Sequence, residues 1–151
     1  MQQLAAFHRK QFTYPVVGIT GSVGKTTLKE WAFHCLSPYM NVVRSPKSFN
    51  SQLGVALSLL ELHEDADFAL IEAGISEPGE MELLEQMIKP TIGVFTAFGK
   101  AHEQNFGTKE HHFSEKIKLF TNCATVFVSQ QISSLGYSLP NNFTSCTATN
   151  E

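Results

Sequence analysis

The sequence predicts a three-layer α/β domain, in which a mainly parallel central sheet is flanked by helices. Short apolar runs typical of strands alternate along the chain with segments of helical spacing. Such alternation is typical of parallel sheets covered on both faces. The 151 residues fit one domain, since domains usually contain about 100 to 200 residues. Four prolines fall between the expected elements, where a missing N–H group does least harm; they are Pro38, Pro46, Pro78 and Pro90.

Each element in the first half of the chain follows from a local pattern. The strand at 15–20 is an apolar run, and the helix at 25–36 begins after the glycines that follow this strand. The strand at 41–44 leads into a loop that contains Pro and Ser residues. After that loop, Ser51 can cap a helix at 52–62.

The second half of the chain continues the alternation. A purely apolar run predicts a strand that extends over 68–73, and a helix is expected at 79–88, after Pro78. Two further strands are expected at 91–96 and 125–129, separated by an amphipathic helix at 109–120. Strands and helices therefore alternate as a mainly parallel sheet requires.

Composition excludes several classes of protein. With 42% apolar and 17% charged residues, the chain is too hydrophobic for disorder. No apolar run approaches the roughly 18 residues of a membrane span, and residues 1–10 lack the order of a secretory signal, so we expect a cytoplasmic protein. The net charge of −3 argues against a nucleic-acid partner. The odd number and wide spacing of the cysteines indicate free thiols; these are Cys35, Cys123 and Cys146.

The segment 18–27 reads Gly-Ile-Thr-Gly-Ser-Val-Gly-Lys-Thr-Thr and connects the first strand to the first helix. Gly21 and Gly24 allow the backbone to curl so that successive N–H groups point at an anion, and the helix adds its positive dipole end. Lys25 would reach the outer phosphates, and the Thr26 hydroxyl can bind the Mg²⁺ that accompanies a nucleotide. The segment therefore predicts a phosphate-binding loop.

This loop departs from the strict pattern at one position, where Ile19 stands in place of glycine. A glycine-rich turn with a solvated lysine is the alternative interpretation. We favour the phosphate loop because a strand precedes it, a helix follows it and the Gly-Lys-Thr-Thr run is intact.

Glu72 comes directly after the apolar strand residues 68–71. Ligands of such folds lie at the carboxyl ends of the strands. A carboxylate buried there is unfavourable unless it is paired or bound to a metal. We therefore predict that Glu72 binds Mg²⁺, directly or through water, and a solvated glutamate just past the sheet is the alternative.

Two more loops lie at the same predicted edge. His102 follows the strand at 91–96, and this position distinguishes it from the other histidines, for which we expect structural roles. Asn50 and Ser51 lie in the loop after the strand at 41–44. They are predicted either as ligand contacts or as the turn and the cap of the following helix. The other histidines are His8, His34, His63, His111 and His112.

Several motifs together resemble the central, ATP-binding domain of the Mur ligases, enzymes that build the peptide stem of bacterial peptidoglycan. They occur in family order over residues 12–129. Within the family, residues 74–81 and 106–107 are most similar to the ligases that add D-alanyl-D-alanine to UDP-N-acetylmuramoyl-tripeptide. Residues 44–48 are further similar to a form fused to alanine racemase. The motifs are the phosphate loop at 18–27 and the segments 49–55, 71–74, 78–80, 89–93 and 101–102.

The resemblance implies roles for particular residues. Thr26 and Glu72 would bind the first Mg²⁺, and His102 would serve a second. Asn50 matches the first asparagine of a family pair and Ser51 stands in place of the second, so these two are the expected substrate-binding positions. The ATP phosphates would be held by Gly21, Ser22, Val23, Gly24, Lys25, Thr26 and Thr27.

Lys116 aligns with the lysine that becomes carbamylated in this family. Carbamylation converts an ammonium, which would repel Mg²⁺, into an anion that can coordinate it. The implied reaction is attack of a substrate carboxylate on the γ-phosphate of ATP, followed by attack of the D-alanyl-D-alanine amine on the acyl phosphate. Lys25, Glu72, His102 and Lys116 are then the catalytic residues, and a surface lysine on an amphipathic helix is the alternative for Lys116.

Complete Mur ligases also have an N-terminal domain for the uridine nucleotide and a C-terminal domain that closes on ATP. Residues 1–151 are therefore expected to be a single, truncated central domain that lacks both. Its polar stretch 137–151 is expected to be a loose terminus or a cut end. Such a fragment should bind Mg·ATP weakly and ligate nothing. Two other functions stay open, a folylpolyglutamate synthase-like ligase domain and a non-catalytic phosphate-loop module.

Overall fold

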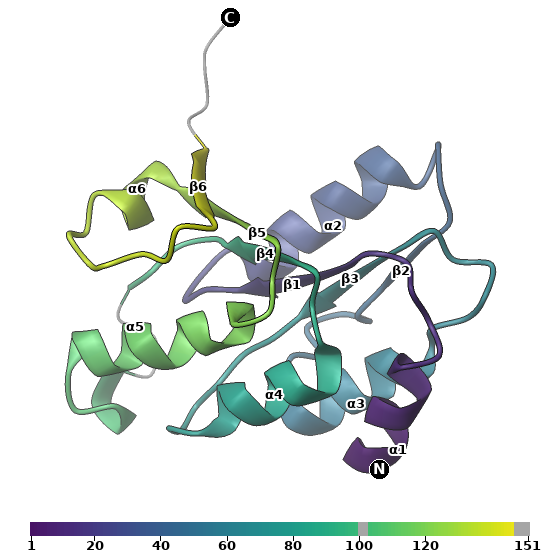
Figure 1. Ribbon diagram of the computed structural model, residues 1–151, viewed down its shortest axis with the longest axis horizontal. Coiled ribbons are helices and arrows are strands. Elements are labelled where there is room, and N and C mark those ends of the chain that lie inside the picture. The colour runs from purple at the N-terminus through teal and green to yellow at the C-terminus, as the bar shows by residue number, and fades with distance from the viewer. Residues whose placement is uncertain (100–102, 147–151) are drawn as a thin grey trace, which may run out of the picture.

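The structure is a computed structural model that describes residues 1–99 and 103–146. Within these residues, six strands form one sheet in the order β2-β3-β1-β4-β5-β6, and every neighbouring pair is parallel (Figure 1). The strands are β1 Val16–Thr20, β2 Val42–Arg44, β3 Phe68–Glu72, β4 Ile92–Phe95, β5 Thr125–Ser129 and β6 Phe143–Cys146. The helices are α1 Gln2–Arg9, α2 Lys25–Leu36, α3 Gln52–Leu60, α4 Glu80–Ile88, α5 Lys109–Ile117 and α6 Gln130–Ser133, with the 3-10 turns η1 Glu103–Asn105 and η2 Lys118–Phe120.

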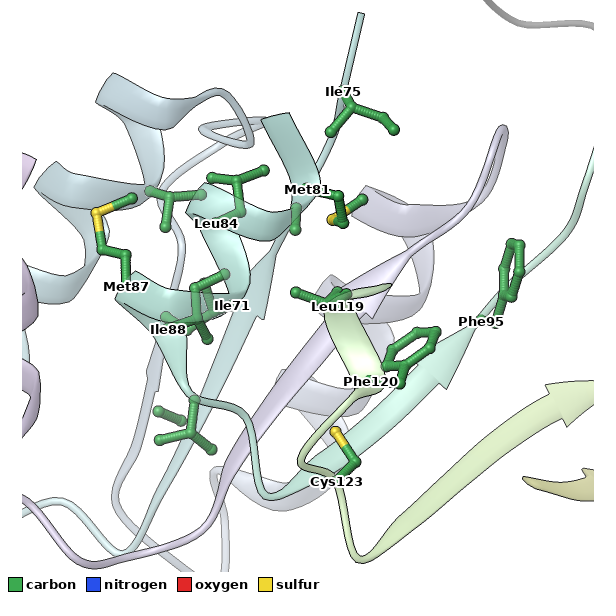
Figure 2. Close-up of a cluster of buried hydrophobic side chains, with 14 of the residues drawn as sticks. Ile71, Ile75, Met81, Leu84, Met87, Ile88, Phe95, Leu119, Phe120 and Cys123 are labelled. Carbon is green, nitrogen blue, oxygen red and sulfur yellow. The ribbon is translucent and has the colours of Figure 1, made fainter. Parts of the chain in front are cut away.

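Helices cover both faces of the sheet. α2 packs on one face, and α1, α3, α4 and α5 lie together on the other (Figure 1). The larger core lies on the side of the four helices, where Met81 and Leu84 of α4 pack with Ile71 of β3 (Figure 2). Among the described residues, no helix combines the length and apolarity needed to cross a membrane.

The direction of Glu72 follows from the alternation of side chains along β3. Leu70 packs in the small cluster on the α2 face, whereas Ala69 and Ile71 belong to the core on the opposite face. Because alternate residues of a strand point to opposite faces, Glu72 shares the face of Leu70. The strand therefore ends by directing a carboxylate toward the first turns of α2.

The predicted fold class is confirmed. The helix expected at 25–36 has those bounds, and the strands agree within one residue at each end. The helix expected at 109–120 is α5 followed directly by the 3-10 turn η2. The sequence did not predict α1 near the N-terminus or α6 and β6 near the C-terminus. It also did not predict the 3-10 turn η1.

The expectation of a loose terminus was wrong for residues 143–146. These residues form β6, which pairs with β5 in parallel from Phe143 opposite Val126 to Cys146 opposite Ser129. The strand is mostly exposed and polar, so it carries little of the apolar signal from which strands are predicted. Its pairing comes from backbone groups at the edge of the sheet, and Phe143 packs edge-on against Phe120.

The end of α4 is held by Arg9, which gives a first testable prediction. The buried guanidinium donates hydrogen bonds to the carbonyl oxygens of Ile88 at 2.8 Å, Phe12 at 2.7 Å and Lys89 at 3.2 Å. Terminal carbonyl groups of a helix lack intrahelical donors. Arg9→Ala is therefore expected to lower the free energy of unfolding by about 2 kcal/mol, measured by urea denaturation.

The matched control is Lys10→Ala, which removes a cation of the same sign from the neighbouring, exposed position. It should change the free energy of unfolding by less than about 0.5 kcal/mol. Equal effects of the two substitutions would show that net charge, and not the cap on α4, determines the result.

Candidate functional site

The loop after β1 lies at the centre of the sheet, between the ends of β3 and β4. In open parallel sheets, ligands bind where the strand order reverses, at the carboxyl ends of the strands. The loop is braced against the segment after β4: the Ser22 N–H donates to the carbonyl oxygen of Ala97 at 2.7 Å, and the Thr96 hydroxyl donates to that of Val23 at 2.7 Å. The Ser22 N–H, predicted to face a phosphate, thus already has an acceptor.

Two glycines give the loop its shape. Gly21 has φ 150° and Gly24 has φ 83°, a region that favours glycine. Gly24 is the N-cap of α2, so the helix begins at Lys25. The first N–H groups of a helix have no intrahelical acceptor, and together with the helix dipole they favour an anion.

Lys25 folds back over this loop. Its ammonium donates to the carbonyl oxygen of Gly21 at 2.9 Å. Burial lowers the pKa of Lys25, and the nearby Glu72 carboxylate opposes this shift. The amine of Lys25 thus lies beside the loop, where a phosphate would be a stronger partner than a carbonyl group.

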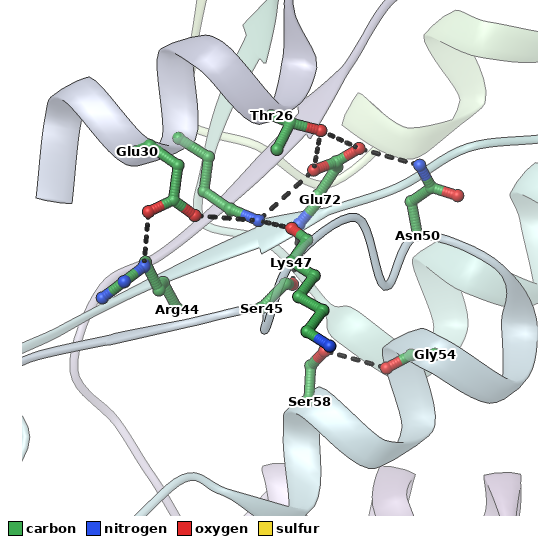
Figure 3. A network of polar contacts seen from close by, with 10 residues as sticks. Thr26, Glu30, Arg44, Ser45, Lys47, Asn50, Gly54, Ser58 and Glu72 are labelled. Carbon is green, nitrogen blue, oxygen red and sulfur yellow. Dashed lines mark hydrogen bonds and ion pairs between the residues drawn. The ribbon is translucent and has the colours of Figure 1, made fainter.

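Glu72 lies at the centre of a polar cluster (Figure 3). The carboxylate is fully buried, and it accepts hydrogen bonds from the Thr26 hydroxyl at 2.9 and 3.1 Å and from the Asn50 amide nitrogen at 2.8 Å. The solvated position that we considered as the alternative is therefore wrong for Glu72. Its hydroxyl and amide partners come from α2 and from the loop before α3.

A buried lysine completes the cluster, and the sequence interpretation missed it. Lys29 is fully buried, and its ammonium lies 3.5 Å from Glu72 Oε2 and 3.4 Å from Glu30 Oε1. It also donates to the backbone carbonyl of Lys47. One signal was available: Lys29 is three residues after Thr26 on α2, and residues at that spacing share a helix face.

Asn50 and Ser51 have different surroundings. The Asn50 side chain donates to Glu72, and the backbone carbonyl oxygen of Asn50 accepts the Gly74 N–H at 2.8 Å. The Ser51 hydroxyl accepts the Gly54 N–H at 3.3 Å and caps α3, as one of the two sequence interpretations predicted. Both residues nevertheless border one cavity, which lies over the phosphate loop.

A cavity of about 130 Å³ lies over the loop. Lys116 reaches it from α5 and is buried, with 3% of its surface exposed. Burial lowers the pKa of Lys116 to about 8, and the Lys25 ammonium contributes to the shift. The surface position that we considered for Lys116 is therefore wrong. The cavity is lined by Gly21, Ser22, Lys25, Asn50, Ser51, Gly74, Ile75, Ser76, Glu80 and Lys116.

The donor set fits a nucleotide-borne Mg²⁺. Within residues 1–99 and 103–146, no group of three or more His, Cys, Asp or Glu side chains could hold a metal. Mg²⁺ is commonly bound by only one or two carboxylates, with water and substrate phosphates as its other ligands. The neighbouring oxygens of Thr26 and Glu72 match that pattern, whereas His102 lies outside the described residues.

By fold and by the arrangement of this edge of the sheet, the chain has the architecture of an α/β nucleotide-binding domain of the phosphate-loop class. Residues 19–134 match the family described as the Mur ligase middle domain. The chain belongs to this family, and the resemblance seen in the sequence motifs is confirmed.

Curated relatives include two proteins named UDP-N-acetylmuramoyl-tripeptide--D-alanyl-D-alanine ligase. The protein from Synechocystis is 46% identical over 101 residues, which cover 67% of this chain and 22% of the relative. The protein from Borreliella burgdorferi is 34% identical over 132 residues, which cover 87% of this chain and 28% of the relative. The chain therefore spans only about a quarter of the length of these relatives.

Two solved structures of MurF proteins contain the same fold. MurF from Acinetobacter baumannii superimposes with a TM-score of 0.81 at 30% identity, over 86% of this chain and 30% of that chain. MurF from Thermotoga maritima, solved in complex with ADP, has a TM-score of 0.75 at 29% identity, over 85% of this chain and 30% of that chain.

Proposed function

We propose that this chain is the ATP-binding part of a ligase that adds D-alanyl-D-alanine to UDP-N-acetylmuramoyl-tripeptide in peptidoglycan synthesis. The names of the relatives support this assignment. The single observation that carries it is the contact between the Thr26 hydroxyl and the buried Glu72 carboxylate, next to the phosphate loop and Lys25. This arrangement provides oxygen ligands for a metal beside a site for a polyphosphate.

The phosphate loop supplies the nucleotide contacts in this proposal. Backbone N–H groups at the start of α2 and the Lys25 ammonium bind the phosphates of ATP, and Thr26 and Glu72 hold Mg²⁺. The metal, when bound, supplies positive charge that stabilises the phosphoryl oxygens during transfer. The protein then needs no side-chain nucleophile, because the substrate carboxylate attacks the γ-phosphate, which releases ADP and forms the acyl phosphate, and the amine then displaces phosphate from it.

Lys116 and His102 have proposed roles at a second metal position. Lys116 reaches the cavity that Lys25 also lines, and as a carbamate it would present oxygens instead of an ammonium. Asn50 holds Glu72, and we propose that Asn50 and Ser51 border the path of the acceptor substrate. The role of His102 rests on its family match alone.

The partners of this domain are the substrates and the flanking domains of a longer ligase. We propose that the reaction takes place in the cytoplasm, where ATP is available. On its own, the 151-residue chain is expected to bind nucleotide without forming a peptide bond, because domain closure and substrate orientation supply much of the rate. Peptide-bond formation by this polypeptide alone would contradict the proposal.

Calorimetric titration with ATP in MgCl₂ tests the nucleotide site. Lys25→Ala should weaken binding by about tenfold or more, since it removes a charge-assisted hydrogen bond to phosphate. Lys10→Ala removes an exposed lysine outside the site and should leave the affinity unchanged. Equal affinities of the wild type and Lys25→Ala would refute the phosphate site.

Glu72→Gln separates the ligase from a non-catalytic phosphate-loop module. The substitution keeps the size of the side chain and removes the charge that binds a metal, so Mg²⁺ should no longer strengthen ATP binding. Unchanged Mg²⁺ dependence would favour the module. A folylpolyglutamate synthase-like domain would share the ATP site, and the names of the relatives favour the cell-wall ligase over it.

A further inference from the structure

Lys29 is a charged side chain of the polar cluster to which neither the phosphate loop nor the cavity gives a role. It lies one helical turn after Lys25 and Thr26 on α2, and it is fully buried. A buried ammonium is unfavourable unless acceptors surround it. The groups around the Lys29 ammonium therefore indicate its role.

Three acceptors from three parts of the chain converge on Lys29. They are the carboxylate of Glu72 at the end of β3, the carboxylate of Glu30 on α2, and the backbone carbonyl of Lys47 in the loop after β2. That loop continues to Asn50, which holds the other oxygen of Glu72. The Lys29 ammonium thus links α2 to the end of β3, which carries the proposed metal ligand Glu72. It also links α2 to the loop after β2, which carries Asn50.

The charges around Lys29 are balanced in pairs. Glu30 accepts from Arg44 at 3.0 Å (Figure 3). The Arg44 guanidinium also lies 3.5 Å from the centre of the Phe33 ring. Burial raises the pKa of Glu30, but hydrogen bonds from Arg44 and Lys29 hold it below its usual value. With Glu30 bound to Arg44, the ammonium of Lys29 is left to balance Glu72.

The position of Glu72 depends on these contacts together. Its backbone N–H donates to the Ser45 hydroxyl at 3.0 Å, in the same loop that Lys29 holds through Lys47. Thr26, Asn50 and Lys29 then surround the carboxylate. Of these three, only Lys29 brings a charge, so its loss would leave the buried carboxylate without a cation at ion-pair distance.

We propose that Lys29 is a positioning residue, which holds Glu72 and the loop before α3 in the arrangement that binds a nucleotide-borne divalent cation. This inference rests on the proposed function. Among the described residues, the hydrogen bonds and ion pairs of the Lys29 side chain go to Glu72, Glu30 and Lys47, which lie outside the phosphate loop and the cavity lining, so Lys29 acts through Glu72 and the loop before α3. Its removal should therefore affect the metal contribution to nucleotide binding and spare the nucleotide contact itself.

The test compares the affinity for ADP in MgCl₂ with that in EDTA, by calorimetry on the 151-residue chain. We expect Mg²⁺ to strengthen ADP binding to the wild type by about fivefold or more. In Lys29→Met this ratio should fall close to one, while the affinity in EDTA stays that of the wild type. Glu30→Gln is the matched control, because it removes another partner of Lys29 but leaves the contact with Glu72, and it should keep the ratio.

Other outcomes overturn the inference in distinguishable ways. If Lys29→Met keeps the Mg²⁺ effect, or weakens binding equally in MgCl₂ and EDTA, Lys29 has only a structural role. If the wild type itself binds no ADP, both the proposed function and the inference about Lys29 are refuted.

A measurement on the wild type decides the question if Lys29→Met does not fold. The buried ammonium of Lys29 should give a protected ¹⁵N resonance, assigned by its loss in Lys29→Gln or by through-bond correlation. Mg·ADP should shift this resonance, and ADP in EDTA should not. A resonance that is insensitive to Mg²⁺ would overturn the proposal.

Discussion

Gly21→Ala is expected to abolish nucleotide binding and to lower the free energy of unfolding by at least about 3 kcal/mol. An added Cβ atom would lie 2.1 Å from the Thr96 hydroxyl and 3.0 Å from the Ala97 carbonyl oxygen. The hydroxyl cannot simply turn away, because it holds the loop through its hydrogen bond to Val23. The φ of 150° adds strain for any residue with a Cβ atom. Urea denaturation and ADP titration measure the two effects.

Gly136→Ala is the control for backbone strain. Gly136 also has a positive φ, 76°, but nothing lies within 4 Å of its added Cβ atom, and it is outside the site. This variant should lose about 1 to 2 kcal/mol and bind ADP as the wild type does. Equal losses of stability in the two variants would mean that the contact with Thr96 contributes nothing.

The parts of the fold that the sequence predicted are those with strong local signals. β3 is an unbroken apolar run, and the helix after the phosphate loop begins where the glycines end. β6 and α1 lacked such signals. β6 is a polar edge strand held by backbone pairing, and α1 is fixed by long-range contacts, namely its packing on α3 and α4 and the hydrogen bonds of Arg9 to the end of α4.

The residues of the candidate site likewise differ in whether a local sequence signal predicted them. Glu72 could be predicted because a carboxylate directly after an apolar strand is unusual, and the register then directs it to the α2 face. Lys29 was not assigned, because the two partners that enclose it from other parts of the chain, Lys47 and Glu72, lie 18 and 43 residues away, and only Glu30 is its neighbour in sequence. A lysine on an amphipathic helix normally points to solvent, and only the position of the loop before α3 shows that this one is enclosed.

Lys116→Met is expected to stabilise the protein at neutral pH. Burial, with a contribution from Lys25, lowers the pKa of Lys116 from 10.5 to about 8. The folded state therefore releases the proton more readily than the unfolded state. This difference corresponds to about 3 kcal/mol, at roughly 1.4 kcal/mol for each pH unit. Below pH 8 the charged amine opposes folding fully, and this penalty disappears as the pH rises toward 10.5.

The advantage of Lys116→Met over the wild type should therefore be about 3 kcal/mol at pH 7 and should shrink steadily above pH 8. Urea denaturation at several pH values measures it. Lys118→Met is the control, since it removes a lysine of the same helical region whose side chain is 41% exposed and lies beside Glu115. A gain that is independent of pH would show that the new methyl packing, and not the buried charge, stabilises the variant.

We expect the same burial to make Lys116 reactive toward CO₂. Only a neutral amine attacks CO₂; at pH 8 about half of Lys116 is neutral, compared with less than about 1% of an ordinary lysine. NMR in ¹³C-bicarbonate should show one carbamate signal that Lys116→Met removes and Lys118→Met retains. The modification would replace the repulsion between Lys116 and Lys25 by attraction. Carbamylation would therefore stabilise the fold without metal and would also supply an anion at the cavity. A carbamate signal that survives in Lys116→Met would contradict both expectations, because the modified residue would then be another one.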